Sequence, residues 1–147
     1  MEKSRRMNTT HITVDTLVTA PLNRVWLSWT KPEEIQRWNF ATDDWRCPTG
    51  ESDLKIGGHY KARMEAKDGS FGFDFAAVFE EIEPHQSITM VMDDGRRTHT
   101  TFVEMGNGTQ VTTTFDAEMS NPIEMQRDGW QAILNNFKRH VETSEGT

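Results

Sequence analysis

The 147-residue sequence predicts a single α+β domain with one strand, two short helices, an antiparallel meander and a long C-terminal helix. Two observations support this fold class. From residue 59 onward apolar and polar side chains alternate, which is the period of strands with one buried face. From residue 122 onward the apolar positions follow a helical period instead. A meander with one apolar face must bury that face, and the long helix is the available partner.

The first elements are a strand and two short helices. Residues 12–18 alternate between two faces, which predicts a strand that ends before Pro21. An apolar stripe at i, i+3, i+4 and i+7 over residues 22–29 predicts a short amphipathic helix. In Thr30-Lys31-Pro32-Glu33 a hydroxyl precedes a carboxylate by three positions, so we expect a capping box that begins a second short helix.

The middle of the chain is expected to form strands in close succession. Residues 39–58 show little periodicity and predict a loop with a short strand around Trp45. The strongest alternation lies between Phe71 and Phe79, and turn sequences such as Asp93-Asp94-Gly95 separate the following runs. Residues 96–105 and 109–118 complete the predicted meander, and a helix is expected over residues 122–142.

Composition and charge exclude several classes of protein. Aromatic residues make up 10% of the chain, which a disordered segment would lack. No apolar run approaches the roughly 18 residues of a membrane-spanning helix, so we expect no membrane span. The chain has 16 Lys and Arg against 23 Asp and Glu, a net charge of −7, and this balance disfavours a nucleic acid as partner.

The chain ends and the cysteine content give further expectations. Residues 1–10 predict a disordered tail, and residues 11–143 a single domain. The tail lacks the apolar stretch of a signal peptide, so a cytoplasmic location is expected. The single cysteine, Cys47, cannot form an internal disulfide, and no flanking pair of basic residues lowers its pKa. We therefore expect an unreactive, semi-buried thiol.

Neither a metal site nor a cofactor is predicted. The five histidines are scattered, without the close spacing of metal ligands. Gly106-Asn107-Gly108-Thr109 begins like a dinucleotide-binding loop but leads into a strand, where that motif requires a helix.

No catalytic residue is assigned, although four side chains are weak candidates for acid–base chemistry. Alternation places Tyr60 inward and Arg63 outward. Asp74 faces solvent and pairs with a cross-strand Lys or Arg if the phenylalanines beside it face inward; in the reversed register it is a buried carboxylate with a raised pKa. His99 is the histidine best placed to reach an enclosed cavity.

Short motifs along residues 11–143 resemble those of one family. In order they are Ala20-Pro21-Leu22-Asn23-Arg24-Val25-Trp26, Thr30-Lys31-Pro32-Glu33-Glu34-Ile35-Gln36-Arg37-Trp38, Gly57-Gly58-His59-Tyr60, Glu81-Ile82-Glu83-Pro84, Gly108-Thr109-Gln110-Val111-Thr112, and Gly129-Trp130 followed by Leu134. Together they resemble the START-like (SRPBCC) superfamily and, within it, the family of the C-terminal domain of the heat-shock-protein-90 ATPase activator. Asn39-Phe40-Ala41 departs from the family's second aromatic and Gly-Pro pair, which leaves the shape of a cavity mouth open.

The resemblance implies a helix-grip fold, in which a curved antiparallel sheet wraps around the long C-terminal helix. START-like proteins use the gap between sheet and helix for apolar ligands, and Met and large rings suit a cavity of adaptable shape. For each residue taken singly, a plain core position is the simpler interpretation. The candidate ligand-binding residues are Trp38, Tyr60, Met64, Phe71, Phe73, Phe75, Met90, Met92, Phe102, Trp130 and Phe137.

Three functions are compatible with these observations. We favour a protein that binds a small hydrophobic molecule and has no catalytic site. Some START-like relatives imply an enzyme of polyketide cyclase or dehydratase type, and the family name implies a chaperone-associated interaction protein. Chaperone activators carry a further N-terminal domain, which the ten residues before the first strand would not supply. A homodimer formed through a sheet edge or the short helices is also compatible with the sequence.

Overall fold

The computed structural model describes residues 10–144, so the predicted tail, apart from Thr10, lies outside the described residues. In chain order the elements are β1 (His11–Val18), α2 (Leu22–Thr30), α3 (Pro32–Trp38), β2 (Trp45–Ser52), β3 (His59–Ala66), β4 (Gly72–Glu83), β5 (Ser87–Met92), β6 (Arg97–Met105), β7 (Gly108–Asp116) and α4 (Ile123–Ser144). This is the predicted order of elements.

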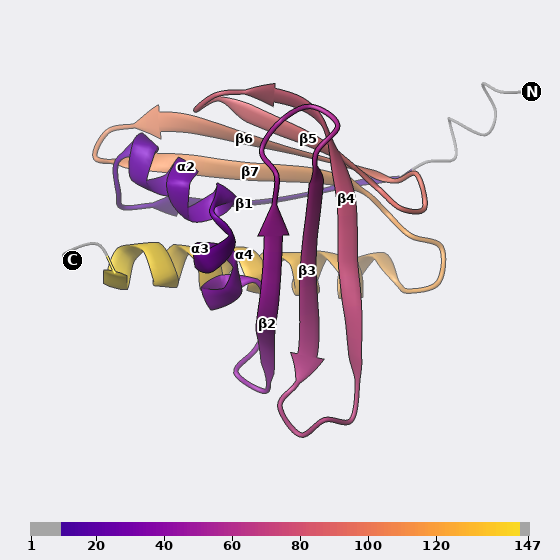
Figure 1. Ribbon diagram of the computed structural model, residues 1–147. Coiled ribbons are helices and arrows are strands. Elements are labelled where there is room, and N and C mark those ends of the chain that lie inside the picture. Colours follow the sequence, from indigo (N-terminus) through magenta and orange to yellow (C-terminus); the bar gives the residue numbers. More distant parts are fainter. Residues whose placement is uncertain (1–9, 145–147) are drawn as a thin grey trace, which may run out of the picture.

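The seven strands form one antiparallel sheet in the order β1-β7-β6-β5-β4-β3-β2. The sheet curls into a half-barrel that holds α4, while α2 and α3 lie across one end of it (Figure 1). Helix α4 packs mainly on β1, and α3 packs on β2. The predicted fold class, a curved sheet around a long helix, is therefore confirmed.

The strand register determines which side chains share the inner face. On β6, Thr98 lies between Met90 of β5 and Phe115 of β7. Two residues further along the same strand, Thr100 lies opposite Thr113. Side chains at alternate positions of a strand point to the same face, so these three threonines share the side that faces α4.

Two adjacent glycines before β3 are needed for different reasons. Gly57 has a positive φ of 86°, which side chains with a Cβ rarely adopt. At Gly58 a Cβ would overlap the carbonyl oxygen of Asp53. The Gly58 backbone also accepts a hydrogen bond from the Phe79 amide at 2.9 Å. The two glycines thus let the loop before β3 lie close to β4, and β3 begins directly after them at His59.

Two local predictions differ from the structure. The Thr30 hydroxyl donates to the carbonyl of Trp26 at 2.9 Å, inside α2, so it does not cap α3 and the predicted capping box was wrong. Residues 45–52, predicted mostly as loop, form the edge strand β2. Its pairing with β3 is irregular between Arg46 and Thr49, and this bulge interrupts the alternation that would have revealed the strand.

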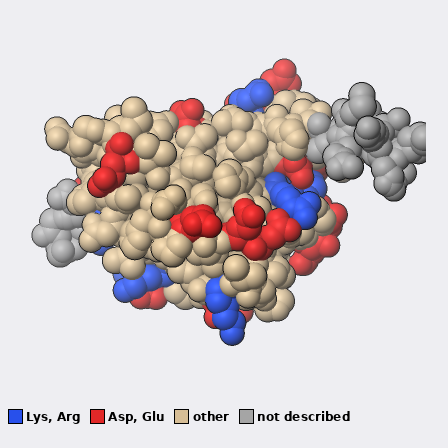
Figure 2. All heavy atoms as spheres, turned by 90° about the horizontal axis from the view of Figure 1, so that it is seen from above, with Lys and Arg blue, Asp and Glu red and all other residues tan. Residues whose placement is uncertain are grey.

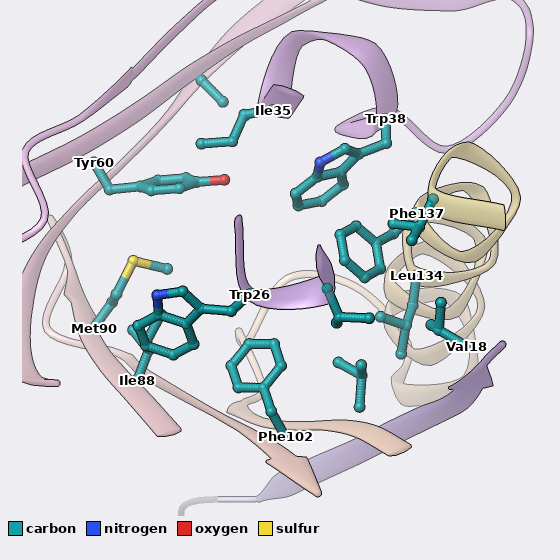
Figure 3. Packing of buried hydrophobic residues seen from close by; sticks show 14 of the residues in the cluster. Val18, Trp26, Ile35, Trp38, Tyr60, Ile88, Met90, Phe102, Leu134 and Phe137 are labelled. Atoms are coloured by element: carbon teal, nitrogen blue, oxygen red, sulfur yellow. The ribbon is translucent and has the colours of Figure 1, made fainter. Parts of the chain in front are cut away.

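The hydrophobic core lies where the three helices meet the sheet (Figure 3). Phe137 of α4 is fully buried and packs edge-on against Trp29 and Trp38, with ring centroids 4.9 and 4.8 Å away. Beyond the reach of α4, the ends of β3 and β4 project past the helix (Figure 1). There the inner face is open, and Phe71 is 62% exposed and Phe73 42% exposed.

Candidate ligand-binding site

A cavity of about 150 Å³ lies between the inner face of the sheet, α4 and the two short helices. It is lined by Val14, Trp29, Trp38, Asn39, Tyr60, Met64, Phe73, Phe75, Met90, Thr98, Thr100, Thr113, Trp130, Ile133 and Leu134. These residues come from all three helices and from every strand except β2. The lining contains no Asp, Glu, Lys, Arg or His side chain.

Aromatic rings on two sides of the cavity pack against neighbouring rings. Trp130 of α4 stacks flat on Phe115, with ring centroids 3.9 Å apart and planes inclined by 12°. Phe75 meets the same indole edge-on at 6.1 Å. Across the cavity Trp29 stacks on Trp38 at 5.0 Å. These ring–ring contacts give both sides an apolar surface and favour the observed ring orientations.

Strands β6 and β7 contribute hydroxyl groups to the lining. Thr98, Thr100 and Thr113 are each only 3% exposed. The hydroxyls of Thr100 and Thr113 are hydrogen-bonded to each other at 2.8 Å. The hydroxyl of Thr98 has no hydrogen-bond partner among residues 10–144. These strands therefore offer one satisfied hydroxyl pair and one free hydroxyl.

Tyr60 and Asn39 form a second polar point at the end of α3. Asn39 is buried and its Nδ2 donates to the Tyr60 hydroxyl at 3.0 Å. The tyrosine ring projects from β3 with its hydroxyl toward the side on which Trp38 lies (Figure 3). Burial raises the pKa of Tyr60 above its ordinary value, and the nearby Cys47 adds to the effect. The Tyr60 hydroxyl therefore stays protonated and uncharged at neutral pH.

The cavity reaches solvent at the open end of the sheet. Phe73 lines the cavity and also exposes 42% of its surface. Trp45 of β2 approaches Phe71 and Phe73 edge-on, at 6.0 Å from each ring. We refer to Trp45, Phe71 and Phe73 as the hairpin-end aromatics. Of these three residues, Phe73 lines the cavity, and Trp45 and Phe71 lie beside it.

Comparison with known proteins identifies the family. Residues 19–142 match the family model described as "Activator of Hsp90 ATPase homolog 1-like protein". The chain belongs to this activator-like family. No curated protein matches it by sequence.

Solved structures support the same assignment. The AHSA1-like protein of Aeromonas hydrophila is 41% identical, with a TM-score of 0.87 over 92% of this chain and 94% of that one. A protein of Cytophaga hutchinsonii is 39% identical, with a TM-score of 0.77 over the same shares of the two chains. A protein of Chromobacterium violaceum has a TM-score of 0.81 over 90% of this chain and 98% of that one; at 23% identity it shows the fold alone.

In this activator-like chain the predicted ligand-binding residues fall into two groups. Those that line the cavity are Trp38, Tyr60, Met64, Phe73, Phe75, Met90 and Trp130. The others lie outside the lining. Met92, Phe102 and Phe137 are buried in the core, and Phe71 is exposed beside Trp45. Phe102 and Phe137 pack edge-on against Trp29 in the core, a contact that the period of a single element does not encode.

The candidates for acid–base chemistry lie mostly on the outer face. Asp74 is exposed and its carboxylate lies 3.6 Å from Arg63, its cross-strand partner, as predicted for the register in which the neighbouring phenylalanines face inward. His99 is exposed and its Nδ1 lies 2.7 Å from the Thr89 hydroxyl, so the expectation that it reaches an enclosed cavity was wrong. Thr98 and Thr100 face inward, and the residue between them must face outward.

Sequence analysis missed several lining residues, chiefly Trp29, Asn39 and the three threonines. Trp29 was recognised only as part of a helical stripe. The alternation of Thr with other residues in β6 and β7 was visible, but threonine suits either face of a sheet. Thr98 and Thr100 alternate with Phe102 on the same face of β6. Because a large aromatic side chain favours the inner face, this spacing could have shown that the two threonines point inward.

Other kinds of site find little support in the described part of the chain. Within residues 10–144 no three His, Cys, Asp or Glu side chains gather closely enough to hold a metal ion. None of the helices described is both long and apolar enough to cross a membrane. On the face seen in Figure 2, Lys and Arg lie beside Asp and Glu and form no continuous basic patch.

Proposed function

We propose that this chain binds a small, uncharged and mainly apolar molecule in the cavity between the sheet and α4. One observation carries the proposal: a cavity of about 150 Å³ has a mainly apolar lining without any charged side chain. Apolar side chains that line such a cavity face water or empty space and lack the close contacts of a packed core. A ligand of matching shape would restore those contacts.

The size of the cavity limits the ligand. An engineered cavity of about 150 Å³ lined by aliphatic and aromatic side chains is known to bind benzene. Cavities for drug-sized molecules are larger, at about 300–1,000 Å³. The ligand therefore has about the size of a single substituted ring, unless the hairpin-end aromatics move apart to admit more.

The lining also limits the charge of the ligand. A carboxylate or ammonium group loses its hydration on entering the cavity, and no opposite charge in the lining compensates for this loss. Tyr60 is the only titratable side chain in the lining, and its raised pKa keeps it neutral. Binding of a neutral molecule thus has more support than acid–base catalysis.

The proposal is tested by titrating the protein with toluene and following the indole NH signals of Trp29 and Trp130 by NMR. We expect toluene to shift both signals in the wild type. Ile133→Phe places a ring in the cavity and should abolish the shifts, whereas Leu27→Phe, at an exposed position of α2, should preserve them. Wild-type indole signals that do not respond to toluene, or respond equally in Ile133→Phe, would contradict the proposal.

A further inference from the structure

We propose that the Thr98 hydroxyl is the recognition point of the cavity, and that the ligand carries one neutral hydrogen-bonding oxygen or nitrogen directed at it. The inference rests on the proposed function and specifies the ligand class further. It predicts a phenol-like molecule, whose ring contacts the aromatic side chains of the lining and whose polar group points to Thr98 on β6.

The Thr98 hydroxyl is placed on the cavity wall by the register of β6. Thr98 is 97% buried, since only 3% of its surface is exposed. Its cross-strand neighbours on the inner face are Met90 and Phe115, which offer no oxygen or nitrogen from their side chains. The side-chain oxygens that are buried without a hydrogen-bond partner among residues 10–144 are those of Ser28 and Ser52, so the Thr98 oxygen is not sealed off but open to the cavity that its side chain lines.

Nearby threonines show that the fold supplies partners elsewhere on the same face. Thr100 and Thr113 bond to each other at 2.8 Å. Thr109, which is fully buried, donates to the Ala20 carbonyl at 2.9 Å. Thr98 differs from them in two respects, because it has no partner among residues 10–144 and its side chain borders the cavity. A ligand is the partner that this position can accept.

The neighbouring groups define the polar end of the ligand. A threonine hydroxyl both donates and accepts, so a hydroxyl, carbonyl or amide group can pair with it. The absence of charged side chains in the lining excludes a carboxylate or an ammonium group as a favourable partner. The remaining lone pairs of the Thr100–Thr113 pair lie on the same wall and can accept a second bond from the same ligand group.

The experiment compares phenol with toluene, which differ in a hydroxyl against a methyl group. Dissociation constants are measured by NMR titration for the wild type, Thr98→Val and Thr101→Val. Thr101 lies on the same strand but faces the other side, so its variant is the matched control. We expect Thr98→Val to weaken phenol binding by about five- to tenfold, the effect of one lost hydrogen bond, and to leave toluene binding within about twofold.

Charged probes complete the test. Benzoate and tetramethylammonium should each bind the wild type at least about tenfold more weakly than phenol, because each must leave its hydration shell without compensation. The inference is overturned if Thr98→Val changes phenol and toluene affinity by the same factor or changes neither, or if benzoate binds as tightly as phenol. In those cases toluene binding still supports the proposed function. The proposed function itself fails if neither toluene nor phenol binds the wild type.

Discussion

The inner face of the sheet has two parts that look alike in sequence and differ in the folded chain. In β7, beneath α4, Val111, Thr113 and Phe115 are buried in strict alternation. Phe71, just before β4, and Phe73, at its start, continue an equally regular alternation and are 62% and 42% exposed. Alternation shows that side chains share a face, but only the reach of the helix determines whether that face is covered.

The largest effect should distinguish the two parts directly. Phe137→Ala removes a fully buried ring that contacts Trp29 and Trp38, and we expect a loss of about 3–5 kcal/mol in the free energy of unfolding. Phe71→Ala removes a ring of the same size from the open end and should cost less than about 1 kcal/mol. Urea unfolding of both variants and the wild type measures the difference.

Comparable losses in the two variants would contradict this distinction. They would mean that the hairpin-end aromatics are covered in solution, by a change of conformation or by another molecule. The denaturant slope gives a check, because a variant that changes only stability leaves the slope unchanged.

The fold was predictable because its elements are regular. The helical period after residue 122 and the alternation from residue 59 onward identify the long helix and the meander, and the motif order identifies the family. Edge strand β2 was largely missed, because Pro48 and the bulge between Arg46 and Thr49 break its period. The capping of α3 was also wrong, since Thr30 could equally bond within α2.

A smaller effect on stability should distinguish two threonines on the inner face of the sheet, Thr109 in the packed core and Thr98 at the cavity. Thr109→Val leaves the Ala20 carbonyl without the Thr109 hydroxyl, and we expect a loss of about 1–3 kcal/mol. Thr98→Val removes a hydroxyl without a partner among residues 10–144, and should leave stability unchanged or raise it. Thermal unfolding of the two variants checks this, and equal losses would indicate that the Thr98 hydroxyl is satisfied in the folded state.

The candidate site was only partly predictable, because its rings and its threonines are placed by different features of the fold. Large rings such as Tyr60, Phe75 and Trp130 could be placed because aromatic residues are strongly enriched on inner faces of strands and helices. The polar wall depends on cross-strand register, which brings Thr100 opposite Thr113. Register follows from the pairing of distant segments and from bulges, and a single sequence does not fix it.

A still smaller effect concerns Cys47, which lies on β2 close to the open end yet is buried. Burial raises the pKa of its thiol to about 11 from an ordinary 9.0. Between these pH values the unfolded chain loses the proton first, so stability should fall as pH rises from 9 to 11. The contribution lost at pH 10 is roughly 1 kcal/mol.

Urea unfolding of the wild type and Cys47→Ala at pH 8, 9 and 10 measures this contribution. The pKa of Tyr60 is raised mainly by its own burial, so folded Tyr60 stays protonated up to pH 10 in both proteins, and the difference between them reports the thiol. We expect the advantage of the wild type over Cys47→Ala to narrow as pH rises. A constant difference would show that the thiol is hydrated, and that the open end extends as far as β2.

The smallest effect is expected on the outer face of the open end. Asp74 is exposed and pairs with Arg63 at 3.6 Å, and exposed ion pairs of this kind contribute about 0–1 kcal/mol. Asp74→Asn should therefore change stability by less than about 0.5 kcal/mol and leave phenol affinity unchanged between pH 5 and 8. Its neighbours Phe73 and Phe75 line the cavity from the other side of the same strand. A shift in phenol affinity for Asp74→Asn would thus mean that β4 moves when ligand binds, and that the open end takes part in binding as well as in access.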